Sequence, residues 1–211
     1  LDKLKVFKLF AIIGGSIGGC LTWEMAAIKK NIADKIIPVA SDWKANDWLI
    51  ANTYLQDRIL KNSKDPIGDA RIHAMTFYRS PKSFNQRFSR SKNNEKGMYN
   101  VESWLDHHAV KLNKRFSLKS YKFMNKLLRS VNITRDDSTL ESKIISSNTE
   151  IHIVSVNSDI FFLPTEDKLT TSRLKKQKVK IQNHIIKSVH GHDAFLIESK
   201  QISDIFTKIL I

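Results

Sequence analysis

The 211-residue chain has a single cysteine, Cys20, and so cannot form an internal disulfide. A chain without disulfides is typical of a reducing compartment, and we expect a cytoplasmic protein. The sequence also lacks an apolar run near the roughly 18 residues that a membrane-spanning helix needs. Its most apolar stretch, 9–20, is interrupted by four glycines and a serine, and no small-residue cleavage site follows it. We therefore predict neither a membrane span nor a signal peptide.

Acidic residues are scarce relative to basic ones. The chain has 21 aspartates and glutamates and 35 lysines and arginines, which gives a net charge of +14. Such an excess can bind nucleic acid. The basic residues are spread along the chain, however, and the densest run, 173–180, has no interleaved aromatic residues and no finger or recognition-helix pattern. We predict a solvated basic surface and no nucleic-acid partner. An acidic partner such as a coenzyme phosphate is compatible with this charge.

The first forty residues predict a strand, a sharp turn, a helix and a second strand. Residues 4–13 are mostly apolar and β-branched, as in a buried strand, and they run into the glycine-rich segment 14–19. Apolar residues then recur at helical spacing across 21–28, and 35–40 favours another short buried strand. A strand–helix–strand unit makes its two strands parallel, so the predicted fold class is α/β.

The rest of the chain separates a helical stretch from a second alternation of strands and helices. Residues 41–131 show helical periodicity and no convincing strand. The elements predicted after them are a connection with one short helix (132–148), a strand (151–156), a helix (165–178), a weaker strand (184–189) and a closing amphipathic helix (199–210).

These elements suggest a parallel sheet interrupted by a helical lid. We divide the chain into a first part of the sheet (1–40), a helical lid insertion (41–131) and a second part of the sheet (132–211). Three convincing strands are too few to cover two layers of helices, and the first begins almost at residue 1. We therefore expect that an N-terminal portion of the sheet is missing from this sequence.

The segment Gly14-Gly15-Ser16-Ile17-Gly18 matches the nucleophile-elbow pattern G-x-S-x-G. In this pattern the serine lies on a strained turn between a strand and a helix, with no room for bulk two residues to either side. The N–H of Ile17, at the start of the helix, can then help to hold a developing oxyanion. The alternatives are a structural glycine-rich turn and a phosphate-binding loop, but the segment lacks both the Walker ending and G-x-G-x-x-G spacing.

A serine nucleophile needs a base and an acid that orients the base, and in proteins with this elbow they follow the serine in the order acid, histidine. Asp159 comes just after the predicted strand 151–156, where the end of a strand would present an acid over the sheet. A turn or cap role for Asp159 is the alternative. His190 and His192 lie between the last predicted strand and the last helix. Spacing alone does not choose between these two histidines.

No metal site is predicted. His107 and His108 are adjacent on a predicted helix, so their side chains point about 100° apart. No cluster of carboxylates or cysteines accompanies them. We interpret both as surface or packing residues.

The sequence resembles homoserine O-acetyltransferases, a branch of the α/β-hydrolase superfamily, over almost the whole chain. The segments that carry the resemblance are Ile13–Gly19 with Trp23-Glu24, Asp69-Ala70-Arg71, Thr76–Ser80, Val101–Leu105, Lys114–Phe116, Ser120-Tyr121, Val156–Asp159 and Gly191–Leu196. In that family the base is the histidine followed by Asp-Ala-Phe. The resemblance therefore selects His192 over His190.

The resemblance implies a partial, N-terminally truncated α/β-hydrolase fold and a double-displacement acetyl transfer from acetyl-CoA to L-homoserine in methionine biosynthesis. Ser16, deprotonated by His192 with Asp159 as the orienting acid, would form an acyl-serine that homoserine then attacks. It also implies that Arg71 pairs with the substrate carboxylate and Asp193 with its ammonium group, with Tyr78 as a further polar contact. A homodimer is expected, with no bound cofactor and acetyl-CoA or succinyl-CoA as donor.

Two departures from the family pattern accompany the resemblance. The segment between Leu60 and Asp69 is shorter than the glycine-rich loop of many members, and the N-terminal strands with the second oxyanion N–H are absent. Because one such donor is typically worth about 10²–10³ in rate, we expect these 211 residues alone to be inactive and poorly stable. The alternatives are a homoserine or serine O-succinyltransferase, an α/β-hydrolase esterase, and a non-enzymatic relic with a basic surface.

Overall fold

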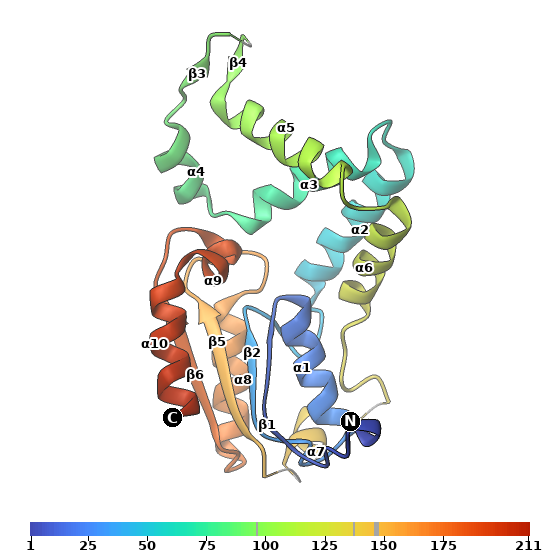
Figure 1. Ribbon diagram of the computed structural model, residues 1–211, viewed down its shortest axis with the longest axis vertical. Helices are drawn as coiled ribbons and strands as arrows, with labels where there is room; N and C mark the ends of the chain where they lie inside the picture. The colour runs from blue at the N-terminus through green and yellow to red at the C-terminus, as the bar shows by residue number, and fades with distance from the viewer. Residues whose placement is uncertain (96, 137, 146–147) are drawn as a thin grey trace.

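The computed structural model describes residues 1–95, 97–136, 138–145 and 148–211, and contains a four-stranded parallel sheet in the order β1-β2-β5-β6 (Figure 1). The strands are β1 (Leu9–Gly15), β2 (Ala33–Val39), β5 (Glu150–Val156) and β6 (Ile181–Ile186). The predicted α/β class with a parallel sheet is therefore confirmed.

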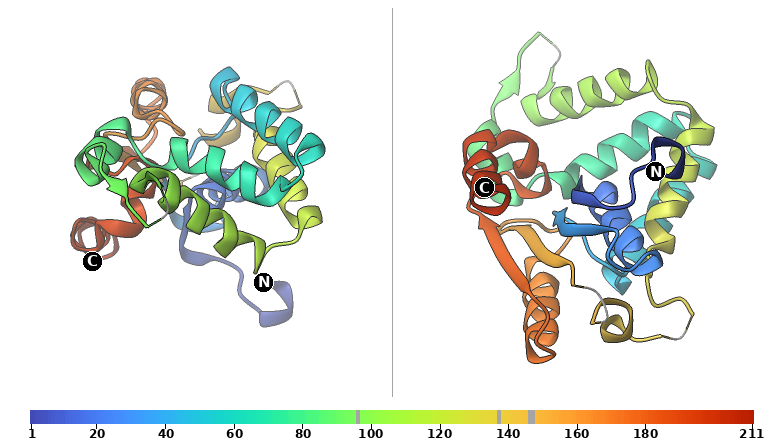
Figure 2. Two further views of the ribbon diagram at one scale, coloured as in Figure 1. Left: turned by 90° about the horizontal axis from the view of Figure 1, so that it is seen from above. Right: turned by 60° about the horizontal axis from the view of Figure 1, so that its bottom comes forward.

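Helices cover both faces of this sheet. On one face α1 (Ile17–Ile28), α7 (Leu140–Ile144) and α8 (Pro164–Lys176) pack around Trp23, Ile36 and Ile153. On the other face α9 (Ala194–Ile197) and α10 (Ser199–Leu210) cover Val154 and Ile186. Figure 2 shows α8 and α10 on opposite sides of the strands. Because β5 is covered on both faces, its residues 151–156 are all buried, which explains why apolar residues predominate in it although His152 and Ser155 are polar.

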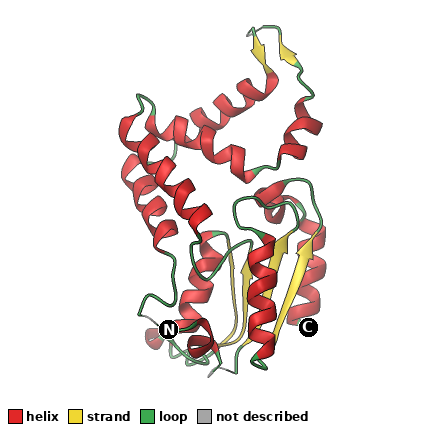
Figure 3. Cartoon of the chain, turned by 180° about the vertical axis from the view of Figure 1, so that it is seen from behind, coloured by secondary structure: helices red, strands yellow, loops and turns green. Residues whose placement is uncertain are grey.

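The remaining helices lie beyond the carboxyl ends of the strands. They are α2 (Asp47–Asn62), α3 (Pro66–Tyr78), α4 (Pro81–Phe88), α5 (Asn100–Asn113) and α6 (Leu118–Ser130). Seen from behind, these helices form the upper part of the molecule and the sheet forms the lower part (Figure 3). The division into 1–40, 41–131 and 132–211 stays an interpretation. Among the described helices, none has both the length and the apolar character needed to cross a bilayer.

Side-chain caps define where several of these upper helices begin. The side chains of Asn46, Asp65, Ser80 and Ser117 each accept a hydrogen bond from a backbone N–H in the first turn of the following helix. Proline occupies the first helical position of α3 and α4, where no intrahelical partner for an N–H is needed. Sequence-local signals therefore place the α3–α4 junction between Tyr78 and Pro81.

Three details of the predicted elements are wrong. Residues 2–4 form a 3-10 turn (η1, Asp2–Leu4) and the first strand begins only at Leu9. That strand is not buried, since Phe10 and Ile13 are 57% and 45% exposed, because β1 is an edge strand of the described sheet. The insertion also contains a hairpin, β3 (Lys92–Asn93) with β4 (Met98–Tyr99), whose two-residue strands are too short to produce a periodic signal. The weak last strand does exist, as β6, three residues earlier than predicted.

Helix α8 offers a test of the packing on the α1 face. Leu174 is fully buried between α8 and the sheet, whereas Leu169 on the same helix is 64% exposed. We expect Leu174→Ala to lower the free energy of unfolding by about 2–5 kcal/mol, because it leaves a cavity in the core. The matched control Leu169→Ala should change it by no more than about 0.5 kcal/mol. Urea unfolding curves measure both, and equal effects would contradict the assigned packing.

Candidate active site

Ser16 lies on a sharp turn between the end of β1 and the start of α1. Its backbone has φ 56° and ψ −125°, in the left-handed half of conformational space that residues with a side chain avoid. The turn is held by a hydrogen bond from the Ser16 N–H to the Val39 carbonyl (2.9 Å), and the Ser16 carbonyl accepts from the N–H groups of Gly19 and Cys20. Strain of this kind persists only where the surrounding structure enforces it. The predicted elbow geometry is thus present.

The two outer glycines of the elbow differ in what they permit. A Cβ on Gly14 would lie 2.1 Å from the Gly18 carbonyl oxygen, so a side chain there would force the turn open. A Cβ on Gly18 would meet nothing within 4 Å. The expectation that neither position has room for bulk is wrong for Gly18, because this residue faces open space from the first turn of α1.

His192 connects Ser16 to Asp159 by hydrogen bonds. Its Nε2 lies 2.9 Å from Ser16 Oγ, and its Nδ1 lies 2.7 Å from Asp159 Oδ2. With Asp159 ionised the ring hydrogen is on Nδ1, which leaves Nε2 to accept the serine proton. The other carboxylate oxygen of Asp159 accepts from the N–H groups of Phe161 (2.7 Å) and Phe162 (3.0 Å). Three residues far apart in the sequence therefore form the arrangement expected of a nucleophile, a base and an orienting acid.

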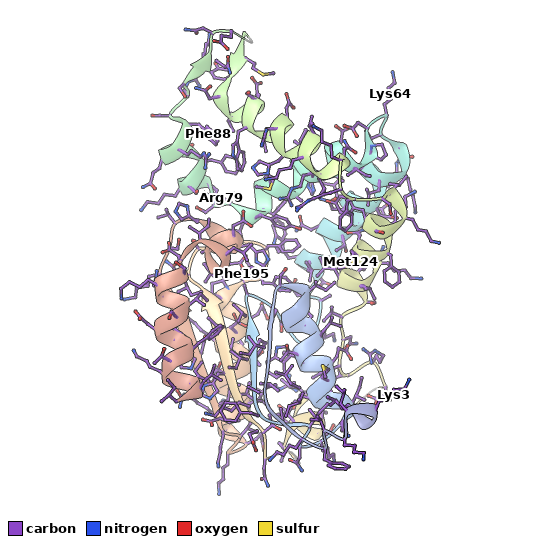
Figure 4. The ribbon with its side chains drawn as sticks, in the orientation of Figure 1. Lys3, Lys64, Arg79, Phe88, Met124 and Phe195 are labelled. Atoms are coloured by element: carbon purple, nitrogen blue, oxygen red, sulfur yellow. The ribbon has the colours of Figure 1, made fainter. Side chains whose placement is uncertain are left out.

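Aromatic rings enclose the imidazole of His192. The ring centroids of Tyr78, Phe161, Phe162 and Phe195 lie 5.3–5.6 Å from that of His192, and His192 itself is 3% exposed. These rings exclude water from the candidate base. In Figure 4 Phe195 and Met124 lie on two sides of this region, between the sheet and the helices above it.

The competing histidine, His190, is directed elsewhere. Its Nδ1 lies 3.1 Å from Arg79 Nη2 and 3.2 Å from Ser83 Oγ. The choice of His192 over His190, which spacing could not make, agrees with this geometry. His108 packs on the Trp104 ring at 4.3 Å between centroids, and no group of three or more metal-binding side chains is found among the residues that the structure describes.

A cavity of about 120 Å³ adjoins Ser16 and Ile17. Its walls come from α2, α3, α6 and Phe161, and its polar lining residues are Asn52, Thr53, Gln56, His73, Tyr121 and Asn125. Gln56 is central to them, because its amide donates to the Ala70 carbonyl and lies 2.8 Å from His73 Nδ1 while its oxygen accepts from the Tyr121 hydroxyl. Sequence patterns did not assign these residues to a cavity, and all of them except Tyr121 lie outside the segments that carry the family resemblance.

Of the three residues expected to contact the substrate, Tyr78 lines the cavity beside Ser16, whereas Arg71 and Asp193 are not among its lining residues. The Arg71 guanidinium lies 5.5 Å from the centre of the Tyr78 ring, and that ring packs on His192. Asp193 follows His192 directly, and its side chain is 22% exposed. Burial raises the pKa of Asp193, while the charges of His192, Arg79 and Arg71 act in the opposite direction. Burial also raises the pKa of the Tyr78 hydroxyl.

A parallel sheet with helices on both faces, a serine on a strand-to-helix elbow, and a histidine and an aspartate within hydrogen-bonding distance define the α/β-hydrolase fold. Comparison with solved structures agrees. A homoserine O-acetyltransferase from Bacillus anthracis superimposes with a TM-score of 0.89 at 13% identity, over 99% of this chain and 61% of that one. Esterase E22 superimposes with a TM-score of 0.86 at 15% identity, over 100% and 63%. At these identities the structures establish the fold alone.

Sequence comparison confirms the resemblance to homoserine O-acetyltransferases. The whole chain aligns with proteins of that name from Methanococcus vannielii, at 31% identity, and from Nautilia profundicola, at 28%. It spans 47% of the first relative's length and 63% of the second's. No model of a protein family matches the chain.

A second buried acid lies on α8. The Ser155 hydroxyl lies 2.7 Å from both Asp167 Oδ2 and Asn183 Oδ1, yet it has only one hydrogen to donate. A protonated Asp167 resolves this conflict, because it donates to Ser155, which then donates to Asn183. Burial, reinforced by the negative charges of Asp42 and Asp159, raises the pKa of Asp167 to about 8. Burial therefore favours the neutral form of Asp167, and an Asn183 amide turned so that its NH2 group donates to Ser155 is the other arrangement that removes the conflict.

The elbow gives a paired prediction. We expect Gly14→Ala to lower the free energy of unfolding by about 1–3 kcal/mol, because the new methyl group collides with a carbonyl, and to displace Ser16 from His192. Gly18→Ala is the control. It should be neutral or stabilising by up to about 1 kcal/mol, since alanine is the better helix former. Denaturant midpoints together with the rate of labelling of Ser16 by a fluorophosphonate distinguish the two, and equal behaviour would contradict the crowding at Gly14.

Asp167 gives a prediction for the pH dependence of stability. An unfolded aspartate ionises near pH 4, whereas folded Asp167 holds its proton to about pH 8. The folded state therefore binds more protons between these values, and stability falls as pH rises through this window. In Asp167→Asn the loss of unfolding free energy from pH 5 to pH 8 should be smaller than in the unaltered protein. The exposed control Asp204→Asn should leave the loss unchanged, and an unaltered loss in Asp167→Asn would show that Asp167 is ionised when folded.

Proposed function

We propose that the protein transfers an acetyl group from acetyl-CoA to the hydroxyl of L-homoserine through an acyl-serine intermediate, as a step of methionine biosynthesis. The observation that carries this proposal is the position of His192, hydrogen-bonded to both Ser16 Oγ and Asp159. The names of the sequence relatives support homoserine and an acyl donor as the substrates.

In the first half-reaction His192 Nε2 removes the Ser16 proton as Oγ attacks the thioester carbonyl. The charge that develops on the carbonyl oxygen is stabilised by the N–H of Ile17, at the N-terminus of α1. His192 then returns its proton to the departing sulfur, and CoA leaves as the free thiol. Asp159 holds the ring in the required tautomer and stabilises the imidazolium.

In the second half-reaction His192 removes a proton from the hydroxyl of homoserine, and the hydroxyl oxygen attacks the carbonyl carbon of the acyl-serine. The bond from that carbon to Ser16 Oγ then breaks, His192 returns the proton to Oγ, and O-acetylhomoserine leaves. For this step the amino acid must be held with its hydroxyl near Nε2. Asp193 is suited to bind the ammonium group, because it adjoins the base and no hydrogen bond to its carboxylate is found among the described residues. Arg71 is suited to the carboxylate, and the Tyr78 ring lies between Arg71 and His192.

The main alternative is an esterase, which would use the same serine and histidine with water as the acceptor. The fold does not distinguish the two, because it is shared with an acetyltransferase and with esterase E22. The pair of opposite charges, Arg71 and Asp193, favours an amino-acid acceptor. A homodimer and a cytoplasmic location complete the proposal, together with the absence of a bound cofactor. Succinyl transfer and a serine acceptor remain its variants.

A thiol-release assay tests this proposal. The full-length protein, purified and supplied with acetyl-CoA, should release thiol quickly only when homoserine is added, and Ser16→Ala should lower that rate by a factor of about 10⁴–10⁶. Ser130→Ala, an exposed serine on α6, is the matched control and should keep the rate. Succinyl-CoA and L-serine, tested in turn, establish the donor and the acceptor. Release that is equally fast without homoserine would identify a hydrolase instead.

A further inference from the structure

The junction between α3 and α4 holds the loop that carries His192. The Ser80 hydroxyl, which also caps α4, donates to the Val189 carbonyl. Gly191 packs directly on the junction, since a Cβ there would lie 2.7 Å from the Ser80 backbone nitrogen. The positive φ of Gly191, 69°, is a second reason for glycine at this position. The loop 189–193 therefore has backbone contact with a segment more than one hundred residues earlier in the chain.

Arg79 lies at this junction, and its guanidinium lies near both His190 and Asp193, the residues on either side of the pair Gly191-His192. It is 9% exposed, and its Nη2 lies 3.1 Å from Ser83 Oγ and 3.1 Å from His190 Nδ1. Its Nη1 lies 4.0 Å from Asp193 Oδ2. A guanidinium can only donate, so His190 must accept through an unprotonated Nδ1. One buried cation therefore lies close to both His190 and Asp193, which flank Gly191 and the candidate base His192.

Asp193 is the group on which this cation acts most directly. The charged and titratable groups around Asp193 are His192 on its own turn, Arg79 and Arg71 from α3 and its end, Asp159 from the loop after β5, and Tyr78 from α3. Burial favours the neutral acid and Asp159 adds to that effect, whereas Arg79, Arg71 and His192 favour the carboxylate. At 4.0 Å Arg79 attracts the Asp193 carboxylate but does not form a bidentate salt bridge with it. The carboxylate oxygens of Asp193 can therefore still accept hydrogen bonds from a ligand.

We propose that Arg79 is a positioning residue that keeps Asp193 charged, and so makes a cationic group on the acceptor a requirement of the site. Arg79 acts through Asp193 and His190 and contacts neither Ser16 nor the reacting atoms. The inference rests on the proposed acyl transfer for its functional meaning. Its structural part, the dependence of the Asp193 charge on Arg79, stands on the contacts alone.

Three variants separate the charge of Arg79 from its anchoring role. Arg79→Met removes the charge and keeps most of the length, and Arg79→Lys keeps the charge with a simpler geometry. Ser83→Ala removes one contact of His190 and no charge. If Arg79→Met does not fold, Arg79→Gln, which can still donate to His190, takes its place. An opposite charge within about 4–6 Å typically moves a carboxyl pKa by about 1–3 units.

The kinetic test is the pH profile of kcat/KM for homoserine. In Arg79→Met the acid limb of this profile should move up by about one pH unit or more. At pH values below that limb, KM for homoserine should be raised about tenfold. Arg79→Lys and Ser83→Ala should keep the limb in place. The burst of p-nitrophenol from p-nitrophenyl acetate, which needs Ser16 but no amino acid, should change far less than kcat/KM for homoserine. An unmoved limb in Arg79→Met, or an equal loss of the burst in Arg79→Met and Arg79→Lys, would overturn the proposal.

A titration that needs no turnover separates this inference from the proposed function. The carboxyl carbon of Asp193 can be followed by NMR in protein labelled with ¹³C-aspartate and assigned by its loss in Asp193→Asn. Its midpoint should rise in Arg79→Met and not in Ser83→Ala. If the midpoint rises in a protein that transfers no acetyl group to homoserine, the proposed function fails and the role of Arg79 in charging Asp193 stands. If the protein transfers acetyl groups but the midpoint stays unchanged, the inference fails and the function stands.

Discussion

The hydrogen-bonded chain from Asp159 through His192 to Ser16 depends on the parallel alignment of the strands. Parallel strands bring their carboxyl ends to one edge, so the turn after β1 and the loop after β5 meet there although Ser16 and Asp159 are 143 positions apart in the sequence. The imidazole can occupy the space between them only because β6 lies next to β5 and delivers its own loop to the same edge. Each buried polar atom of this hydrogen-bonded chain has a partner, which makes the burial of an acid and an imidazole tolerable.

Sequence patterns predicted the parts of the site that local structure determines. The elbow around Ser16 follows from glycine spacing, and the position of Asp159 follows from a strand ending. The choice of His192 needed a family resemblance, because a neighbouring histidine two residues away has the same local signals and differs only in its tertiary partners. The exposure of β1 could not be predicted from its apolar sequence, since burial depends on the order of the strands. The contact between the cavity residues Gln56 and Tyr121 spans 65 positions, and no local pattern in the sequence pairs the two residues.

Because a homoserine O-acetyltransferase and esterase E22 share this fold, the acceptor selectivity of the proposed reaction must come from groups outside the hydrogen-bonded chain. For the proposed acyl transfer, the groups in question are Arg71, Tyr78 and Arg79, from α3 and its end, and Asp193, which follows the base. One helix therefore supplies most of the charge and ring surface on one side of the histidine. Specificity can change by substitution along this helix while the nucleophile, base and acid stay as they are.

The close approach of Gly191 to the backbone of the α3–α4 junction limits how the molecule can admit its substrates. The junction connects two helices above the sheet, and its backbone contacts Gly191 in the loop that carries His192. Because glycine has no side chain, this contact is between two backbones and no side chain can move aside to make room. A rigid swing of those helices about this point would draw the imidazole away from Ser16. The cavity beside Ser16 is walled by α2, α3 and α6, and none of its lining residues belongs to this contact, so a ligand can occupy the cavity without separating the two backbones.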